Sequence, residues 1–281
     1  MQIKLKRLIE IDPRTGGCFD LHEEFGLARL VEENERVTLF LNSVPCRSWQ
    51  KQEHPHIKTL KWLDADHVIL YFDVGGAAIV SNESWENVEL GFISKLFVSK
   101  SYIFVSYTDE SFFRAWPTEL ESNIISVFSH AGHLQFGVRE LFDKDRDADP
   151  LYEITAAYPY DDHIVFVGYD GKFVWILNAA QREWKKIPFE FSEVGIKFLT
   201  GDEKIAYAIY DYRHSEQQPL KLAIFDLESG IASLQDFAPV EAVLTGAGFD
   251  MNEIKFRPNS TGRIIVSDSK KAAFLEFSGL P

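Results

Sequence analysis

Carboxylate side chains recur at one position of a repeated sequence pattern. Six segments share an apolar run, a polar turn and a second apolar run that ends at a polar residue. The six terminal residues are Asn42, Asp73, Asp109, Asp170, Asp211 and Asp268. If the segments form equivalent units, these side chains lie on one rim, where carboxylates could bind a cation or a basic partner. Alternatively, each accepts hydrogen bonds from the backbone of the following turn, as Asp and Asn do in Asx-turns.

A divalent metal ion is one chemistry that such carboxylates could support. By position, the residues that would hold calcium or zinc are Asp73, Glu153, His163 and Asp170. A metal ion held there would polarise a carbonyl group and activate water, which predicts a hydrolase or lactonase acting on a small molecule. The segment Asp143–Asp149 also begins like a calcium loop, but it lacks the glycine and the distal glutamate of such a loop.

Basic residues occupy a second shared position, in the first run of four segments: Arg29, Lys61, Lys197 and Lys255. In one arrangement they bind an anionic ligand together, because a charge-assisted hydrogen bond is strong where water is excluded. In the alternative they pair with the acidic turns just beyond them. Such exposed pairs contribute about 0 to 1 kcal/mol each.

The repeated segments themselves indicate the fold. They begin at Arg29, Lys61, Lys95, Ala156, Lys197 and Lys255. Their second runs are rich in Val, Ile, Phe and Tyr, which favours β-strands, and helical periodicity is hard to find between them. Further strand candidates follow, for example residues 172–177 and 184–189, so each unit would hold four antiparallel strands. A chain of such units resembles the β-propeller superfamily over nearly its whole length, like WD and kelch proteins in architecture only.

This resemblance implies an all-β chain with one propeller domain over residues 1–281. Six four-stranded blades fit the length, and five or seven are the alternatives because residues 240–249 could form another strand. The last copy has three strands, so residues 1–16 are expected to supply the fourth and close the ring. Residues 112–123 and 213–219 are read as blade insertions. In this architecture the four basic residues would face the central channel.

The charge of the chain limits its partners. A net charge of −14 without a Lys/Arg cluster disfavours nucleic acid and anionic membranes. No apolar run is long enough for a signal segment or a membrane span, which predicts a cytoplasmic protein. The acidic turns between the first two strands would attract a basic protein, unless they are ordinary solvated turns. Their candidate partner-binding residues are Asp64, Asp66, Asp161, Asp162, Asp202 and Glu203.

Two function hypotheses follow. The chain lacks the Gly-x-Ser-x-Gly, His-Glu-x-x-His and phosphate-loop patterns of common enzymes. The leading hypothesis is therefore a non-enzymatic protein-binding module without a cofactor, and an immunity or inhibitor protein that masks a basic toxin is one form of it. The competing hypothesis is the metal-dependent hydrolase or lactonase.

Overall fold

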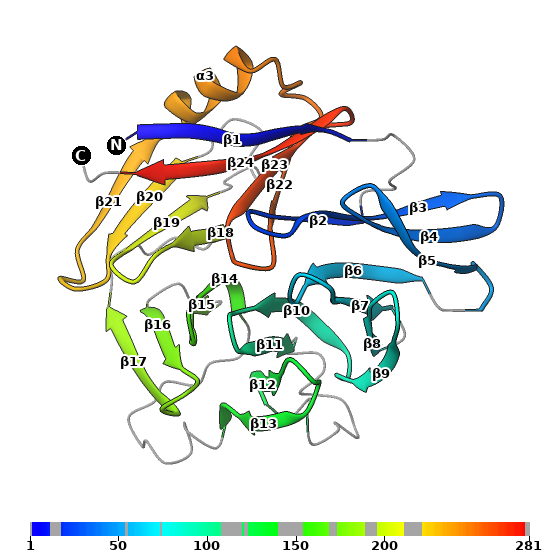
Figure 1. The fold of residues 1–281 in the computed structure, drawn as a ribbon. Helices are drawn as coiled ribbons and strands as arrows, with labels where there is room; N and C mark the ends of the chain where they lie inside the picture. Colours follow the sequence, from blue (N-terminus) through cyan, green and yellow to red (C-terminus); the bar gives the residue numbers. More distant parts are fainter. Residues whose placement is uncertain are drawn as a thin grey trace. The chain divides into compact units, whose positions relative to one another are not determined.

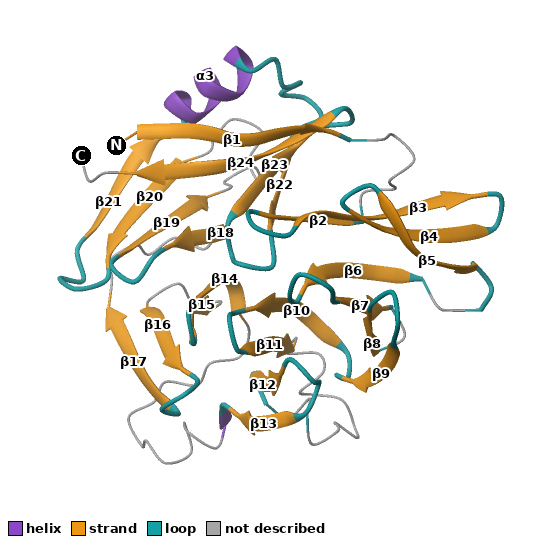
Figure 2. Cartoon of the chain, viewed as in Figure 1, coloured by secondary structure: helices purple, strands orange, loops and turns teal. Residues whose placement is uncertain are grey.

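The computed structural model describes residues 2–11, 18–53, 56–73, 75–107, 120, 123–139, 154–168, 173–188, 196–210 and 221–278. Their strands form six four-stranded antiparallel sheets, the blades of a β-propeller (Figures 1 and 2). The all-β, six-bladed prediction is therefore confirmed. The chain divides into two compact units, which are described separately. That residues 1–281 form a single domain stays a prediction.

Unit 2 comprises residues 12–153 and holds three sheets, in which the strands are ordered as in the sequence. The sheets are β2-β3-β4-β5, β6-β7-β8-β9 and β10-β11-β12-β13. Their strands are β2 (Phe19–His22), β3 (Gly26–Glu33), β4 (Arg36–Leu41), β5 (Val44–Gln50), β6 (Ile57–Trp62), β7 (Val68–Phe72), β8 (Gly76–Val80), β9 (Trp85–Glu89), β10 (Ile93–Val98), β11 (Tyr102–Tyr107), β12 (Ile125–Ser129) and β13 (Leu134–Gly137). The predicted insertion at residues 112–123 falls between β11 and β12, mostly outside the described residues.

Unit 1 comprises residues 1–11 and 154–281. Its sheets are β14-β15-β16-β17, β18-β19-β20-β21 and β1-β24-β23-β22. Their strands are β1 (Gln2–Glu10), β14 (Ile154–Tyr160), β15 (His163–Gly168), β16 (Phe173–Asn178), β17 (Glu183–Pro188), β18 (Ile196–Gly201), β19 (Ile205–Tyr210), β20 (Lys221–Asp226), β21 (Ala232–Asp236), β22 (Lys255–Pro258), β23 (Ile264–Ser267) and β24 (Lys271–Ser278). The predicted insertion at residues 213–219 lies outside the described residues.

The N-terminal strand completes the last sheet, as the sequence predicts. Strand β1 pairs antiparallel with β24, from Gln2 opposite Ser278 to Glu10 opposite Lys271 (Figure 1). The pairing shifts near Arg7, whose φ of +54° marks a bulge in this strand. The two ends of the chain therefore share one blade.

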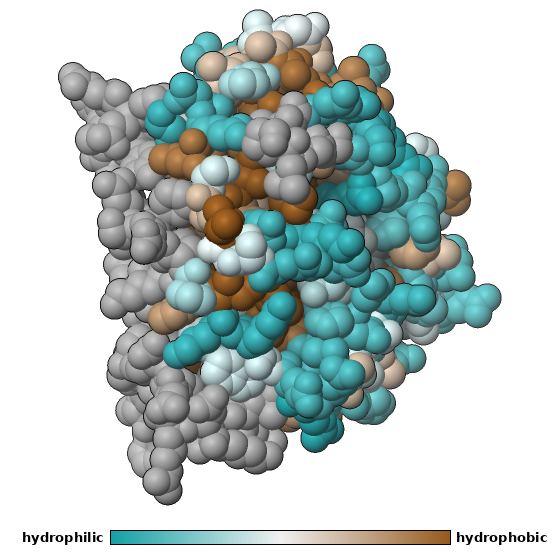
Figure 3. All heavy atoms as spheres, turned by 90° about the vertical axis from the view of Figure 1, so that its left-hand side faces the viewer, coloured by the Kyte–Doolittle hydropathy of each residue, from teal (hydrophilic) through white to brown (hydrophobic). Residues whose placement is uncertain are grey.

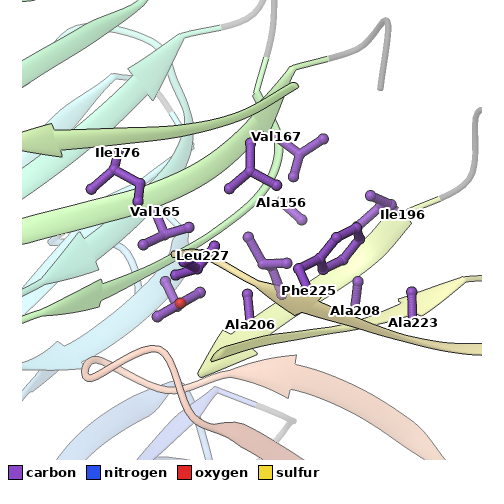
Figure 4. Packing of buried hydrophobic residues seen from close by; sticks show 13 residues of the cluster. Ala156, Val165, Val167, Ile176, Ile196, Ala206, Ala208, Ala223, Phe225 and Leu227 are labelled. Carbon is purple, nitrogen blue, oxygen red and sulfur yellow. The ribbon is translucent and has the colours of Figure 1, made fainter. Parts of the chain in front are cut away.

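Burial explains why the strands differ in composition. The second strand of a blade, such as β7 with the sequence VILYF, is buried along its whole length and is apolar throughout. An outer strand such as β21 (ASLQD) is exposed at most positions and carries polar residues. In unit 1, side chains of β14–β16 and of β18–β20 form one buried cluster, which Figure 4 shows. This apolar packing fixes the two sheets against each other.

Residues 240–249 do not form a strand, so this alternative is wrong. Most of them belong to helix α3 (Ala238–Gly246), which begins with a proline in its first turn. Val240 and Leu244 are four residues apart, lie on one helix face and are buried with Ile3 and Leu5 of β1. The helix lies along β1 (Figure 2).

Lys271 attaches the end of α3 to β24. Its Nζ donates a 2.6 Å hydrogen bond to the backbone oxygen of Ala247 and lies 4.6 Å from the ring centre of Phe249. The Lys271→Ala substitution removes both contacts and should lower the free energy of unfolding by about 1 to 2 kcal/mol. Partial exposure of Lys271 limits the loss to this range. Urea denaturation tests this, with Lys270→Ala as an exposed control expected to change stability by less than about 0.5 kcal/mol. Equal effects of both substitutions would contradict this role of Lys271.

The first repeat is displaced by one strand from its predicted position. The segment from Arg29 covers β3 and β4, which are the second and third strands of their sheet, because β2 precedes them. Placing Arg29 on the innermost strand was therefore wrong, and Asn42 follows the third strand rather than the second. The sequence of β2 is FDLH, and its four residues are all buried. Because Asp20 and His22 are polar, the sequence did not predict this strand.

A buried ion pair joins the first two blades of unit 2. Asp20 on β2 is 0% exposed, and its Oδ1 lies 3.7 Å from the Nζ of Lys61 on β6. Its Oδ2 accepts a 3.0 Å hydrogen bond from the backbone N–H of Trp62. The indole N–H of Trp62 donates to the backbone oxygen of Gly26 on β3, at 3.1 Å. We call Asp20, Lys61 and Trp62 the interblade clasp.

Among the described residues on the face that Figure 3 shows, most are hydrophilic, and hydrophobic side chains are exposed in several places. The large hydrophobic residues most exposed in unit 1 are Leu8, Ile231 and Leu234. Among the described residues, no helix is long and apolar enough to cross a membrane.

Candidate functional site

Three turns of unit 1 meet at the end of strand β14. The hydroxyl of Tyr158 on β14 donates a 2.9 Å hydrogen bond to the backbone oxygen of Asp202, in the β18–β19 turn. In the β22–β23 turn, a Cβ atom added to Gly262 would lie 2.4 Å from the Cβ of Tyr158 and 2.6 Å from the Cδ of Pro159. The residues that follow Pro159 therefore share one surface with residues 202–204.

The β14–β15 turn displays its side chains on this surface. Tyr160 and His163 pair across the strands, which leaves Asp161 and Asp162 as a two-residue turn. Asp161 is exposed and has a φ of +42°, a left-handed conformation that aspartate adopts more readily than most residues. The rings of Tyr160 and His163 stack, with centroids 4.7 Å apart and an interplanar angle of 1°.

Negative charge surrounds the phenol of Tyr160. Burial raises the pKa of Tyr160, and the nearby carboxylates of Glu203, Asp161 and Asp202 raise it further. Burial raises the pKa of Tyr158 well above its usual value, with additional effects of Tyr160 and Asp202. Both phenols therefore keep their protons at neutral pH. Tyr160 offers an aromatic ring and an O–H donor beside three carboxylates.

The fold uses these carboxylates to different extents. One oxygen of Asp202 accepts 2.8 Å hydrogen bonds from the backbone N–H groups of Lys204 and Ile205, which stabilise the turn. Asp161 and Glu203 are exposed, and within the described ranges no hydrogen bond or ion pair holds their side chains. Their charges are therefore available to a partner. We call Tyr160, Asp161, Asp162, Asp202 and Glu203 the acidic turn cluster.

Two further polar atoms of this turn are not used by the described structure. Oδ1 of Asp162 and Nδ1 of His163 are both buried, and neither has a hydrogen-bond partner among the described residues. Buried polar atoms in folded proteins are nearly always hydrogen-bonded. The β14–β15 turn thus differs from the β18–β19 turn, in which the carboxylate of Asp202 holds the backbone.

The predicted partner-binding residues fall into two groups. Asp161, Asp162, Asp202 and Glu203 lie in unit 1, in two turns that the Tyr158–Asp202 hydrogen bond brings together. Asp64 and Asp66 lie in the β6–β7 turn of unit 2.

Asp64 has a structural role in its own turn. Its Oδ1 accepts hydrogen bonds of 2.9 Å from the backbone N–H groups of Asp66 and His67, and it lies 2.9 Å from Nδ1 of His67. Partial burial opposes ionisation of Asp64, but these hydrogen bonds prevail and lower its pKa. Its carboxylate is therefore committed to holding the turn.

The predicted channel cations have separate environments. Lys61 belongs to the interblade clasp and is paired with Asp20, not with the turn acids that follow it. The guanidinium of Arg29 lies 5.3 Å from the ring centre of Phe40. Lys255, on the first strand of its sheet, is exposed. Lys197 is on β18, and its side chain is outside the described part. A shared anion site of these residues stays a prediction.

The predicted metal ligands cannot all be placed. Glu153 and Asp170 lie outside the described residues, whereas His163 belongs to unit 1 and Asp73 to unit 2. In the ranges that the structure describes, no three His, Cys, Asp or Glu side chains are grouped to hold a metal ion. The segment Asp143–Asp149 is also outside these ranges.

Among the described residues at the strand ends, Asp268 follows the Asx-turn interpretation. Oδ1 of Asp268 accepts hydrogen bonds of 2.8 and 2.9 Å from the backbone N–H groups of Lys270 and Lys271. Asn42 instead bridges the preceding loop, through Phe25 and Leu27. Asp73 is described, but three of the set lie outside the described residues: Asp109, Asp170 and Asp211.

The tyrosines and the glycine of this site were not among the predicted residues. The tyrosines could have been found from the run Tyr158-Pro159-Tyr160, directly before the acidic pair at the turn of the fourth repeat. Gly262 gave no such signal, because its close approach to Tyr158 joins residues about a hundred positions apart.

Comparison with known proteins supports the architecture. No family model matches the sequence, and no curated protein is significantly similar to it. Among solved structures, the WD40 β-propeller domain of Doa1 is 10% identical, with a TM-score of 0.50 over 93% of this chain and 78% of that chain. A chain of a mitotic checkpoint complex is 12% identical, with a TM-score of 0.53 over 92% and 73%.

A Bacteroides fragilis protein is similar over nearly its whole length. It is 9% identical, with a TM-score of 0.55 over 99% of this chain and 96% of that chain. Similarity at these identities shows the fold alone, which is a β-propeller.

Proposed function

We propose that the protein is a non-enzymatic binding module whose acidic turn cluster binds a basic segment of a protein partner. The observation that supports it most is the position of Tyr160, whose protonated phenol lies among the carboxylates of Asp161, Asp202 and Glu203. Lysine and arginine side chains form charge-assisted hydrogen bonds with carboxylates. An aromatic face adds a cation–π attraction.

The charge of the whole chain supports this choice of partner. With a net charge of −14, the chain attracts basic proteins at long range and repels nucleic acid. Complementary charge mainly accelerates association and excludes wrong partners. One similar chain comes from a mitotic checkpoint complex, an assembly of proteins, which fits a propeller that binds proteins. An inhibitor or immunity protein that masks a basic toxin is a specific form of this proposal.

Neutralising two unused charges of the cluster should slow binding. In the Asp161→Asn/Glu203→Gln variant, asparagine keeps the left-handed turn possible, and Asp202 still holds its own turn. The association rate with a captured partner should fall about tenfold at low ionic strength and approach the wild-type rate at high salt. Affinity capture from native extract identifies the partner by mass spectrometry, and surface plasmon resonance then measures the rate.

A matched control separates the cluster from net charge. Glu10→Gln/Glu241→Gln removes the same two charges from exposed sites of unit 1, on β1 and α3. This control should bind like the wild type. If both variants slow binding equally, only the net charge matters and the cluster is not the binding site. Stoichiometric calcium or zinc in the purified protein, without any captured partner, would favour the hydrolase hypothesis instead.

A further inference from the structure

The imidazole of His22 holds the β2–β3 turn of unit 2 closed. Its Nδ1 accepts hydrogen bonds from the backbone N–H groups of Glu24, at 3.1 Å, and Phe25, at 3.2 Å. The ring is 9% exposed and stacks on the ring of Phe25, with centroids 4.0 Å apart and an interplanar angle of 7°. The Phe25 ring in turn lies 5.9 Å from the ring of Trp62 in the interblade clasp.

Other blades close the corresponding turn with a different acceptor. In the turns between first and second strands, side-chain oxygens of Asp64, Ser99, Asp202 and Asn259 accept the backbone N–H groups. Hydroxyl and amide oxygens do not titrate, and carboxylates take up a proton only near pH 4. Of these five kinds of acceptor, only an imidazole ordinarily binds a proton between pH 8 and pH 5.

We propose that His22 is a pH-sensitive contact that releases the β2–β3 turn when its imidazole is protonated. The lone pair that accepts the two backbone hydrogen bonds is the one that binds the proton. A protonated Nδ1 is a donor, so it faces two N–H donors and both bonds are lost. Because the open turn binds this proton more readily than the closed turn, lowering the pH shifts the equilibrium towards opening.

The charged residues nearest to His22 in the sequence are Asp20, Glu23 and Glu24. Asp20 on β2 is already paired with Lys61 on β6. Glu23 and Glu24 are exposed residues of the turn itself, where solvent screens their charges. The facing residues 26–28 of β3 carry no charge.

Opening is expected to stay local. The side chain of Asn42 donates to the backbone oxygen of Phe25, at 2.6 Å, and accepts from the backbone N–H of Leu27, at 3.1 Å. Trp62 holds the backbone oxygen of Gly26. These contacts secure the start of β3, so the released segment is Glu23 and Glu24 with the amide of Phe25. Unit 2 alone carries this inference, which is independent of the acidic turn cluster.

Hydrogen exchange of the full chain tests this role of His22 directly. NMR would follow the amides of Glu24 and Phe25 from pH 8 to pH 5, corrected for intrinsic exchange rates. Below about pH 6.5, protection should fall by up to about tenfold per pH unit, whereas the amides of Asp66 and His67 keep theirs. The ¹⁵N shift of His22 Nδ1 should show an unprotonated nitrogen at pH 8. Constant protection, or a protonated Nδ1 at pH 8, would overturn the proposal.

Variants separate the acceptor from the ring. His22→Asn supplies an oxygen that does not titrate, so the protection of Glu24 and Phe25 should not depend on pH. His67→Gln, in the equivalent turn of the next blade, should leave the wild-type response unchanged. If the protection of these amides still depends on pH in His22→Asn, the proposed role of His22 is ruled out. If that variant does not fold, the wild-type protein still decides, since constant protection of both amides between pH 8 and pH 5 contradicts the proposal.

Discussion

Gly262→Ala is expected to destabilise the protein by about 2 to 4 kcal/mol, because it both strains and overpacks the β22–β23 turn. Gly262 has a φ of +75°, which costs an alanine about 1 kcal/mol or more. Its new Cβ would also lie 2.4 Å from the Cβ of Tyr158 and 2.8 Å from its Cα, and such overpacking costs about 1 to 3 kcal/mol. Thermal and urea denaturation measure the loss.

Gly248→Ala is the matched control for this prediction. Gly248 has a similar φ of +71°, but the nearest atom to a new Cβ is Nζ of Lys271, at 3.3 Å rather than 2.4 Å. The control should therefore lose only the conformational part, about 1 kcal/mol. If Gly262→Ala lowers the free energy of unfolding no more than Gly248→Ala does, the β22–β23 turn does not pack closely against Tyr158. The acidic turn cluster would then lose one of its supports.

Asp20→Ala is expected to lower the free energy of unfolding by about 3 to 5 kcal/mol, the usual cost of removing one partner of a buried ion pair. Asp20 is fully buried, and its loss leaves the ammonium of Lys61 inside unit 2 without this counter-ion. It also removes the acceptor for the backbone N–H of Trp62. Urea denaturation gives the free energy, if the transition is two-state.

A double substitution shows whether the buried charge causes this loss. Asp20→Ala/Lys61→Met removes both charges, so the double variant should be more stable than Asp20→Ala alone. Asp20→Asn keeps an oxygen for the N–H of Trp62 and should fall between wild type and Asp20→Ala. A loss below about 1 kcal/mol for Asp20→Ala would mean that the clasp does not join these two blades.

The architecture was predictable from the sequence because it depends on local patterns. Strongly apolar second strands, such as β7 and β15, are recognisable by composition alone. Strand β2 was not recognisable, since Asp20 and His22 are usually surface residues. Their burial depends on Lys61 and Trp62, some forty residues later in the chain. Without β2, the first repeat was placed one strand too early and Arg29 received the wrong register.

The candidate site was predictable only in part, for a similar reason. The acidic turns are visible in the sequence, so Asp161, Asp162, Asp202 and Glu203 could be named. Which carboxylates stabilise their own turns depends on backbone geometry, and Asp202 does so whereas Asp161 does not. The short helix α3 was also missed, because two buried residues in nine give little periodicity.

A hydrogen-exchange footprint of the captured complex shows whether the acidic turn cluster is the binding site. Binding should protect residues 160–163 and 202–205 from exchange, and the Asp161→Asn/Glu203→Gln variant should weaken this protection. Protection confined to other segments, such as the β23–β24 turn, with residues 160–163 and 202–205 unchanged, would contradict it.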